Sequence, residues 1–259
     1  MLVDTHSHLD MPAFDADRDE VLARARTADV LRHVLAATHH DAWPRLRTVC
    51  AAHAGLHPAY GLHPVFLPRH RRGHLASLRE WLERERPVAV GECGLDFHVE
   101  GLSHDEQLVY FDAQLRLARD LDLPVIVHAR RALDAVIQAV RRVGGLSGVV
   151  HSFSGSPEQA RRLYAQGFML GIGGPVTYER AQRLRRTVAA MPIEHLLLET
   201  DAPDQPDSLW RGRRNEPARL GAVLAVVAGL RGAPEDAIAA ATTANALRLF
   251  RLPSSPTPA

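Results

Sequence analysis

Side chains that can bind a metal ion stand at the ends of separate apolar runs along this 259-residue chain. All of them are histidines or carboxylates, which are ligands that divalent metals commonly take from proteins. They are His6, His8, Glu92, His128, His151 and Asp201. If each apolar run is a β-strand, the strand ends would bring these nitrogen and oxygen atoms to one mouth, as metal-dependent hydrolysis requires.

The spacing of the first two histidines suits a chelating pair. Side chains alternate between the two faces of a strand, so His6 and His8 would project from the same face. A His-x-His pair also arises by chance, and alone it would not establish a metal site. The case therefore depends on the other candidates.

Glu92, His128 and His151 each close an almost wholly apolar run. A carboxylate buried there without a partner would be costly, and the chain has no lysine to pair with Glu92, although an arginine could. One histidine at the end of an apolar strand is more often a packed core residue, but two at matching ends of consecutive strands favour ligands. Asp201 could bind a metal or cap a helix, and Pro203 indicates a turn there.

The elements that must position these residues alternate between strands and helices. Apolar runs predict strands over residues 2–8, 32–38, 57–63, 87–92, 123–128, 147–151, 168–172 and 195–201. Helical spacing predicts helices over 17–29, 42–54, 74–86, 104–121, 132–143, 157–167, 177–190, 216–231 and 235–249. Asp17 is the expected cap of the first helix, and Ser156 followed by Pro157 is a typical helix start.

This alternation predicts an α/β fold. Short apolar strands that each precede a helix indicate a parallel sheet covered on both sides. Eight such units favour a TIM (β/α)8 barrel with an additional C-terminal helix, because every candidate ligand then reaches one rim. An open doubly wound sheet is the alternative. Since no linker divides the chain, we expect a single domain over residues 1–252 and a disordered tail at 253–259.

The composition narrows the chemistry. The formal net charge is +1, so any contact with nucleic acid must come from local clusters of charge. Without lysine, a Schiff base, a phosphate-loop lysine and a carboxylated lysine bridge are excluded, and a bridge between two metals must be a carboxylate. Two cysteines are too few for a disulfide framework, and no run approaches the ~18 apolar residues of a membrane span. We expect a cytoplasmic protein.

Several sequence blocks resemble the TatD-type metal-dependent deoxyribonucleases, an amidohydrolase-related barrel family, and they follow the family order over nearly the whole chain. The blocks are Asp4-Thr5-His6-Ser7-His8-Leu9-Asp10, Gly61-Leu62-His63-Pro64, Gly91-Glu92-Cys93-Gly94-Leu95-Asp96, His128-Ala129-Arg130, His151-Ser152-Phe153-Ser154-Gly155, Glu199-Thr200-Asp201-Ala202-Pro203 and Asn215-Glu216-Pro217. Residues 125–206 are similar to the YjjV branch of that family. Cys93 departs from the pattern, which usually has an aliphatic residue, and we interpret it as a small core residue pointing away from Glu92.

The resemblance implies a TIM barrel that hydrolyses DNA phosphodiester bonds, from an end, by a two-metal mechanism. One divalent ion would be held by His6, His8, Glu92 and Asp201, and the second by Glu92, His128 and His151. Glu92 would be the bridge, and Asp201 is the favoured general base. Zinc, manganese and magnesium all suit such ligands. The expected partner is DNA that is single-stranded or has a free end, with no membrane and no obligate protein partner.

Substrate contacts are expected from His63, Arg130 and Asn215. His63 ends the third predicted strand and could donate a hydrogen bond to the scissile phosphate. Arg130 suits a bidentate phosphate contact, with a salt bridge to an acid at the rim as an equal alternative. Asn215 follows the arginines at 211, 213 and 214, which would line either a polynucleotide path or a solvated loop.

Two other functions remain open at this point. The first is hydrolysis of a small molecule in the same barrel superfamily, such as a cyclic amide, a lactone or a phosphotriester. Those relatives often bridge their metals with a modified lysine, which this chain lacks. The second is a non-catalytic metal-binding scaffold, which would be expected to lack at least one of the ligands.

Overall fold

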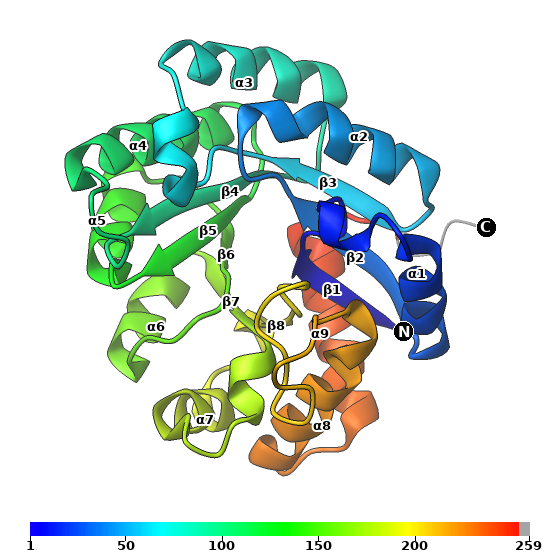
Figure 1. Cartoon of the computed structure of the whole chain (residues 1–259). Helices are drawn as coiled ribbons and strands as arrows, with labels where there is room; N and C mark the ends of the chain where they lie inside the picture. Colours follow the sequence, from blue (N-terminus) through cyan, green and yellow to red (C-terminus); the bar gives the residue numbers. More distant parts are fainter. Residues whose placement is uncertain (254–259) are drawn as a thin grey trace.

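The computed structural model describes residues 1–253, so residues 254–259 of the tail predicted to be disordered lie outside the described residues. Eight parallel strands pair in sequence order, as Figure 1 shows in a view along the barrel. They are β1 (Leu2–Ser7), β2 (Val30–Ala36), β3 (Leu56–Tyr60), β4 (Ala89–Asp96), β5 (Val125–Arg130), β6 (Gly148–Val150), β7 (Phe168–Ile172) and β8 (Leu196–Leu198). The predicted α/β barrel is confirmed.

A helix follows each strand and lies on the outside of the ring (Figure 1). These helices are α1 (Arg18–Thr27), α2 (Trp43–Ala52), α3 (Gly73–Glu85), α4 (His104–Asp120), α5 (Leu133–Val143), α6 (Pro157–Tyr164), α7 (Gln182–Ala190) and α8 (Leu220–Arg231). The additional C-terminal helix is α9 (Glu235–Leu249). Short 3₁₀ turns lie at Pro12–Phe14, His40–Ala42, Pro64–Arg69, Gly174–Thr177, Ile193–His195 and Pro217–Arg219.

The first and last strands meet through side chains, which nearly closes the barrel. The hydroxyl of Thr5 donates to the carbonyl of Leu198 at 2.9 Å. The carboxylate of Asp4 accepts from both the backbone N–H and the hydroxyl of Thr200, at 2.9 and 2.6 Å. The candidate ligands on β1 and after β8 are thereby brought to the same side of the rim.

Two apolar clusters divide the core. The larger one packs the outer face of the strands against the helices. The smaller one fills the barrel interior, with residues from every strand, among them Val34, Ile126, Val149 and Leu197, and it includes Leu249 and Phe250 from the end of α9. Helix α9 contacts β1 and β8 and closes the amino-terminal end of the barrel (Figure 1).

The interior cluster fixes which side chains point inward. Ile126 and Val149 face the interior, so strict alternation also turns His128 and His151 inward. Strict alternation from Val3 and Ala89 would instead turn His6 and Glu92 outward. Each of these two strands contains one extra residue, because Asp4–Ser7 lies opposite His33–Leu35 and Val90–Cys93 lies opposite Val125–Val127. Such β-bulges reverse the phase of the strand, so both side chains enter the barrel.

Helix starts match the prediction in part. Ser156 forms the expected capping box with Gln159, and Pro157 opens α6. Asp17 precedes α1 but makes no capping bond, since its carboxylate binds the guanidinium of Arg214 at 2.8 and 2.5 Å. Asp17 therefore takes the predicted N-cap position, but its side chain does not cap the helix, because an ion pair to the loop before α8 uses its oxygens.

Several element ends near the site differ from the prediction, and β3 for example ends at Tyr60 and not at His63. Strand β4 continues to Asp96 instead of ending at Glu92, which leaves the carboxylate inside the strand. Strand β8 ends at Leu198, so Asp201 lies in the loop that follows, with a positive φ of 59°. Helix α7 also begins later than predicted, because residues 174–177 form a 3₁₀ turn in which the Thr177 hydroxyl bonds the Gly174 carbonyl.

Candidate metal centre

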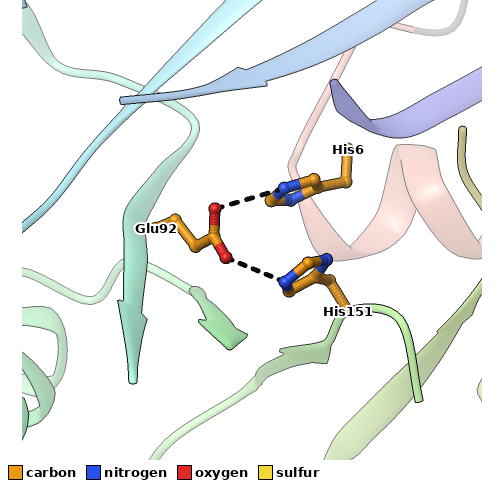
Figure 2. A group of neighbouring side chains, drawn as sticks. All are labelled: His6, Glu92 and His151. Atoms are coloured by element: carbon orange, nitrogen blue, oxygen red, sulfur yellow. Dashed lines mark ion pairs between the residues drawn. The ribbon is translucent and has the colours of Figure 1, made fainter. Parts of the chain in front are cut away.

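Glu92 lies at the centre of the carboxyl-terminal mouth of the barrel, and its two oxygens face different histidines. Oε2 lies 3.3 Å from Nε2 of His6 and 3.6 Å from Nε2 of His8. Oε1 lies 2.8 Å from Nε2 of His151 and 3.2 Å from Nδ1 of His128. Figure 2 shows His6 and His151 on the two oxygens of this carboxylate. One glutamate therefore joins ligands from β1, β5 and the end of β6.

Asp201 completes the cluster from the loop after β8. Its Oδ1 lies 3.5 Å from Nε2 of both His6 and His8, whose Nε2 atoms are 3.2 Å apart. The other oxygen, Oδ2, accepts a hydrogen bond from the side-chain amide of Gln205. The structure thus brings together all of the metal ligands predicted from the sequence.

His63 also belongs to this cluster. Its Nε2 lies 3.1 Å from Oε1 of Glu92, and its ring centroid lies 4.5 Å from that of His128. Alternation from Ala59, which faces the interior, turns both Gly61 and His63 inward beyond the end of β3. The sequence predicted that His63 would reach the rim, but it gave no sign that the ring would lie among the ligands.

The pKa values of two imidazoles beside Glu92 are shifted in opposite directions. Burial, together with the charge of the nearby His151, lowers the pKa of His6 to about 4. Burial would also lower the pKa of His151, but the charge and hydrogen bond of Glu92 raise it to about 10. The two rings stack at 4.0 Å, so a proton on one disfavours a proton on the other.

Both carboxylates are ionised at neutral pH. Burial alone would raise their pKa values, but the surrounding histidines hold the pKa of Glu92 well below its usual range. Asp201 likewise has its pKa lowered to about 2 by its hydrogen bond with His8 and by the charges of neighbouring histidines. Burial would lower the pKa of His8, but Asp201 and Glu92 raise it to about 9. The mouth of the barrel therefore favours bound cations or protons.

The histidine rings also have neighbours on the side that faces away from the other ligands. Nδ1 of His8 lies 2.8 Å from the carbonyl of Ala36, and Nε2 of His128 lies 2.9 Å from Oδ2 of Asp96. Nδ1 of His151 faces Oε1 of Glu199 at 3.8 Å. Such outer partners fix which ring nitrogen faces the metal. Asp96 and Glu199 stand within the family-like sequence blocks, but their place beside the ligands depends on their partners in the fold, so spacing along the chain did not predict it.

The donor atoms fit a divalent cation. Three groups of buried or half-buried ligands have their nitrogen and oxygen atoms within 4.8 Å of one another. They are His6 with Glu92 and His151, His6 with His8 and Asp201, and His63 with Glu92 and His128. Mixed imidazole and carboxylate ligation with no thiol suits zinc, manganese or magnesium.

A cavity of about 600 Å³ opens over these ligands. Its lining includes His63, Glu92, His151 and Asp201 as well as Arg130. Arg130 is exposed and makes no side-chain hydrogen bond or ion pair within residues 1–253, so its guanidinium is free to bind an anion. The salt bridge considered as its alternative is not formed.

Asn215 does not fit the predicted substrate contact. It is 1% exposed, and its amide nitrogen donates to the carbonyls of Thr200 and Asp204, each at 2.8 Å. These bonds tie down the loop that carries Asp201, and they leave the amide with no free donor toward the cavity. The expectation for Asn215 is corrected accordingly: its side chain holds the loop.

Cys93 takes the position expected of a core residue. It is fully buried in the outer cluster, with Sγ 3.7 Å from the carbonyl of Ile126. Neighbouring residues on β4 face opposite sides at this point, so Cys93 points away from Glu92.

A TIM barrel that gathers histidines and carboxylates at the carboxyl-terminal ends of its strands has the architecture of a metal-dependent hydrolase. The family model described as TatD related DNase matches residues 3–251. The chain belongs to this family and is a metal-dependent hydrolase.

Relatives align over almost their full length. The chain is 40% identical over 254 residues to "Uncharacterized metal-dependent hydrolase YjjV" of Escherichia coli, covering 97% of this chain and 98% of that protein. It is 36% identical to "3'-5' ssDNA/RNA exonuclease TatD" of Erwinia billingiae, with 98% and 100% covered. The crystal structure of the E. coli YjjV protein superposes with a TM-score of 0.94 at 39% identity, covering 97% of this chain and 98% of that one. Within residues 1–253, none of the helices has the length and apolar character to cross a membrane.

Proposed function

We propose that this protein hydrolyses phosphodiester bonds of DNA from an end of the strand, with two divalent ions bound at Glu92. The observation that carries the proposal is the arrangement of that carboxylate, each oxygen of which faces its own group of imidazoles. Relatives named as single-stranded DNA and RNA exonucleases support a nucleic-acid substrate. We propose further that residues 1–252 act as one hydrolase domain.

The ligands divide between the two ions as follows. His6, His8, Glu92 and Asp201 would hold one ion, and Glu92, His128 and His151 would hold the other, with His63 beside the second. When bound, zinc, manganese or magnesium would polarise a phosphoryl oxygen and make a bound water more acidic. Glu92 would be the residue shared by the two ions, because the chain has no lysine to take that place.

The protein's own side chains supply the remaining steps. Asp201 is ionised and lines the cavity, so its carboxylate can accept the proton of the water that attacks phosphorus. The free guanidinium of Arg130 is suited to hold a phosphate oxygen in the same cavity. Asp96 keeps the ring of His128 in place through its hydrogen bond with Nε2, and Glu199 lies 3.8 Å behind Nδ1 of His151.

The test uses purified protein loaded with each metal and a single-stranded DNA oligonucleotide labelled at one end. We expect stepwise release of nucleotides, which stops when a chelator is added. Glu92→Ala should reduce the rate by about 10³-fold or more, because a loss of several kcal/mol of charge stabilisation costs tenfold for each 1.4 kcal/mol. Glu80→Ala is the matched control, because Glu80 is exposed on α3 and does not line the cavity over the metal ligands.

A small-molecule panel run in parallel distinguishes the alternative function. It contains a lactone, a cyclic amide and a phosphotriester. Turnover of one of these substrates without release of nucleotides would replace the proposed activity by small-molecule hydrolysis. Metal binding without turnover of any substrate would favour the third function, a non-catalytic metal-binding scaffold.

A further inference from the structure

We propose that a second cavity beside the metal centre binds the nucleotide next to the scissile phosphate, with Arg131 holding its phosphate. This inference rests on the proposed nuclease function. It concerns a part of the surface outside the metal ligands, where one loop joins two cavities.

The second cavity has a volume of about 480 Å³ and adjoins the first. Ala129 and Ser154 line both of them. Its other walls include Arg131 in the loop between β5 and α5, Leu133 at the start of α5, and Phe97 after β4. A chain seated over the metal ligands can therefore continue into this cavity without leaving the surface.

The charge of the second cavity suits an anion. Arg131 is exposed and makes no hydrogen bond or ion pair with any described residue. Arg183, the other cation of the lining, donates to the carbonyl of Ser154 at 2.8 Å. The acid of the lining, Asp134, already pairs with Arg162 at 3.1 Å. Arg131 therefore offers its guanidinium without competition from a neighbouring carboxylate.

Adjacent residues serve the two cavities. Arg130 ends β5 and lines the metal cavity, whereas Arg131 follows with a φ of 53° and lines the second cavity. Because the backbone is left-handed at Arg131, the two consecutive side chains line different cavities. Two free arginines over adjoining cavities match a ligand with regularly repeated negative charges, which a single strand of nucleic acid provides.

The second cavity also offers an aromatic wall. Phe97 stacks on His104 with ring centroids 3.9 Å apart, so the ring is fixed in place. Single-stranded nucleic acids bind through such aromatic faces combined with positive charge. A phosphate contact and a ring within one cavity fit a nucleotide better than they fit an inorganic anion.

The experiment compares Arg131→Ala with Arg116→Ala in the full-length, metal-loaded protein. Arg116 is an exposed arginine on α4 that lines neither cavity and has no side-chain partner among the described residues. The first probe is a ten-nucleotide single strand of DNA with phosphorothioate linkages that resist cleavage. The second is a dinucleoside monophosphate, whose one phosphate is the scissile one.

We expect Arg131→Ala to weaken binding of the ten-nucleotide strand about tenfold, as for loss of a charged hydrogen bond. The slope of log affinity against log salt should fall by about 0.7, which is the effect of one phosphate contact on a single strand. Hydrolysis of the dinucleoside monophosphate should keep its kcat/KM, and Arg131→Lys should keep most of the salt slope. Arg116→Ala should match the wild type throughout.

Equal binding of the ten-nucleotide strand by Arg131→Ala and Arg116→Ala would overturn the inference. A matching loss of kcat/KM on the dinucleoside monophosphate would also overturn it, because Arg131 would then act at the metal centre. Failure of the proposed function would appear separately, as absence of nucleotide release by the wild type, and the binding comparison would still decide the role of Arg131.

Discussion

At the amino-terminal end of the barrel most interior side chains are apolar, with Arg32 buried near them, and α9 closes this end, whereas the carboxyl-terminal end of the same strands holds a cluster of buried histidines and carboxylates. The closed end mostly follows the ordinary rules of packing, with Phe250 2% exposed among the interior side chains. The open end is dominated by polar groups. Buried nitrogen and oxygen atoms of His6, His151 and Glu199 have no hydrogen-bond partner within residues 1–253, and the same is true of His33 and His57 on β2 and β3.

The backbone does not divide in this way. Positive φ angles at non-glycine residues occur at the open end in Arg131, Ser152, Asp201 and Gln205, and also at the other end, before β2, β4 and β5 and after α9, in Asp29, Arg86, Asp122 and Arg251. Such conformations cost free energy and persist where the surrounding structure holds them in place. The comparison teaches that apolar packing at the closed end stabilises the fold, whereas the placement of charged groups at the open end costs free energy. Each of the following experiments tests this division.

The largest expected effect is at the open end. Asp201→Asn removes the proposed base but keeps the size and the hydrogen-bonding reach of the side chain. We expect kcat to fall by about 10²–10⁴-fold, with at least partial metal occupancy and an unchanged fold. Steady-state kinetics and metal analysis check this, with Asp120→Asn at the exposed end of α4 as the control. Unchanged turnover would remove Asp201 from the mechanism.

The converse change is at the closed end. Phe250→Ala should lower the free energy of unfolding by about 3–5 kcal/mol, because it leaves a cavity between α9 and the barrel interior. The kcat of the folded protein should stay close to the wild-type value. Denaturant unfolding and kinetics at low temperature measure the two quantities. A large loss of kcat in fully folded protein would show that the two ends are coupled.

A third change affects the backbone beside β4 that positions Glu92. A Cβ at Gly61 would lie 2.7 Å from the backbone of Gly91 and Glu92, at the bulge that turns Glu92 inward. Gly61→Ala should therefore cost about 1–3 kcal/mol of stability and weaken metal binding. Gly229→Ala on α8, where a Cβ meets nothing within 4 Å, is the control and should be neutral or stabilising. Normal metal affinity in Gly61→Ala would mean that the bulge tolerates displacement.

The last test concerns the dependence of metal binding at the open end on pH. The raised pKa values of His8 and His151, about 9 and 10, mean that the metal-free site holds protons at neutral pH. Their contribution to metal-free stability is complete below the ordinary histidine pKa and is lost as pH rises through 9–10. A cation must displace these protons, so metal affinity should rise with pH, by about tenfold per unit for each proton released.

Calorimetric titration at pH 6, 7 and 8 in buffers of different ionisation enthalpy measures both the affinity and the number of protons released. Phe250→Ala, changed only at the closed end, should give the same slope as the wild type. A flat profile would contradict competition between protons and metal at these histidines.

The amino-acid sequence by itself determined the order of the elements and the identities of most ligands. Apolar runs and helical spacing are local properties, so they gave the eight strands of the barrel and the helix after each of them. Once the structure places Ile126 and Val149 in the interior, local alternation is enough to turn His128 and His151 inward, since each lies two residues further along its strand.

The tertiary structure decided which way the other ligands point and which loops meet, because these features depend on pairing between strands and on contacts between distant segments. One extra residue in β1 and one in β4, visible only in the register with β2 and β5, turn His6 and Glu92 into the barrel. Contacts between distant loops placed His63 on Glu92, tied Asn215 to the loop of Asp201, and put Arg131 beside its own cavity. The spacing of residues along one strand cannot predict these features, because the position of each extra residue is defined by the register with the neighbouring strand.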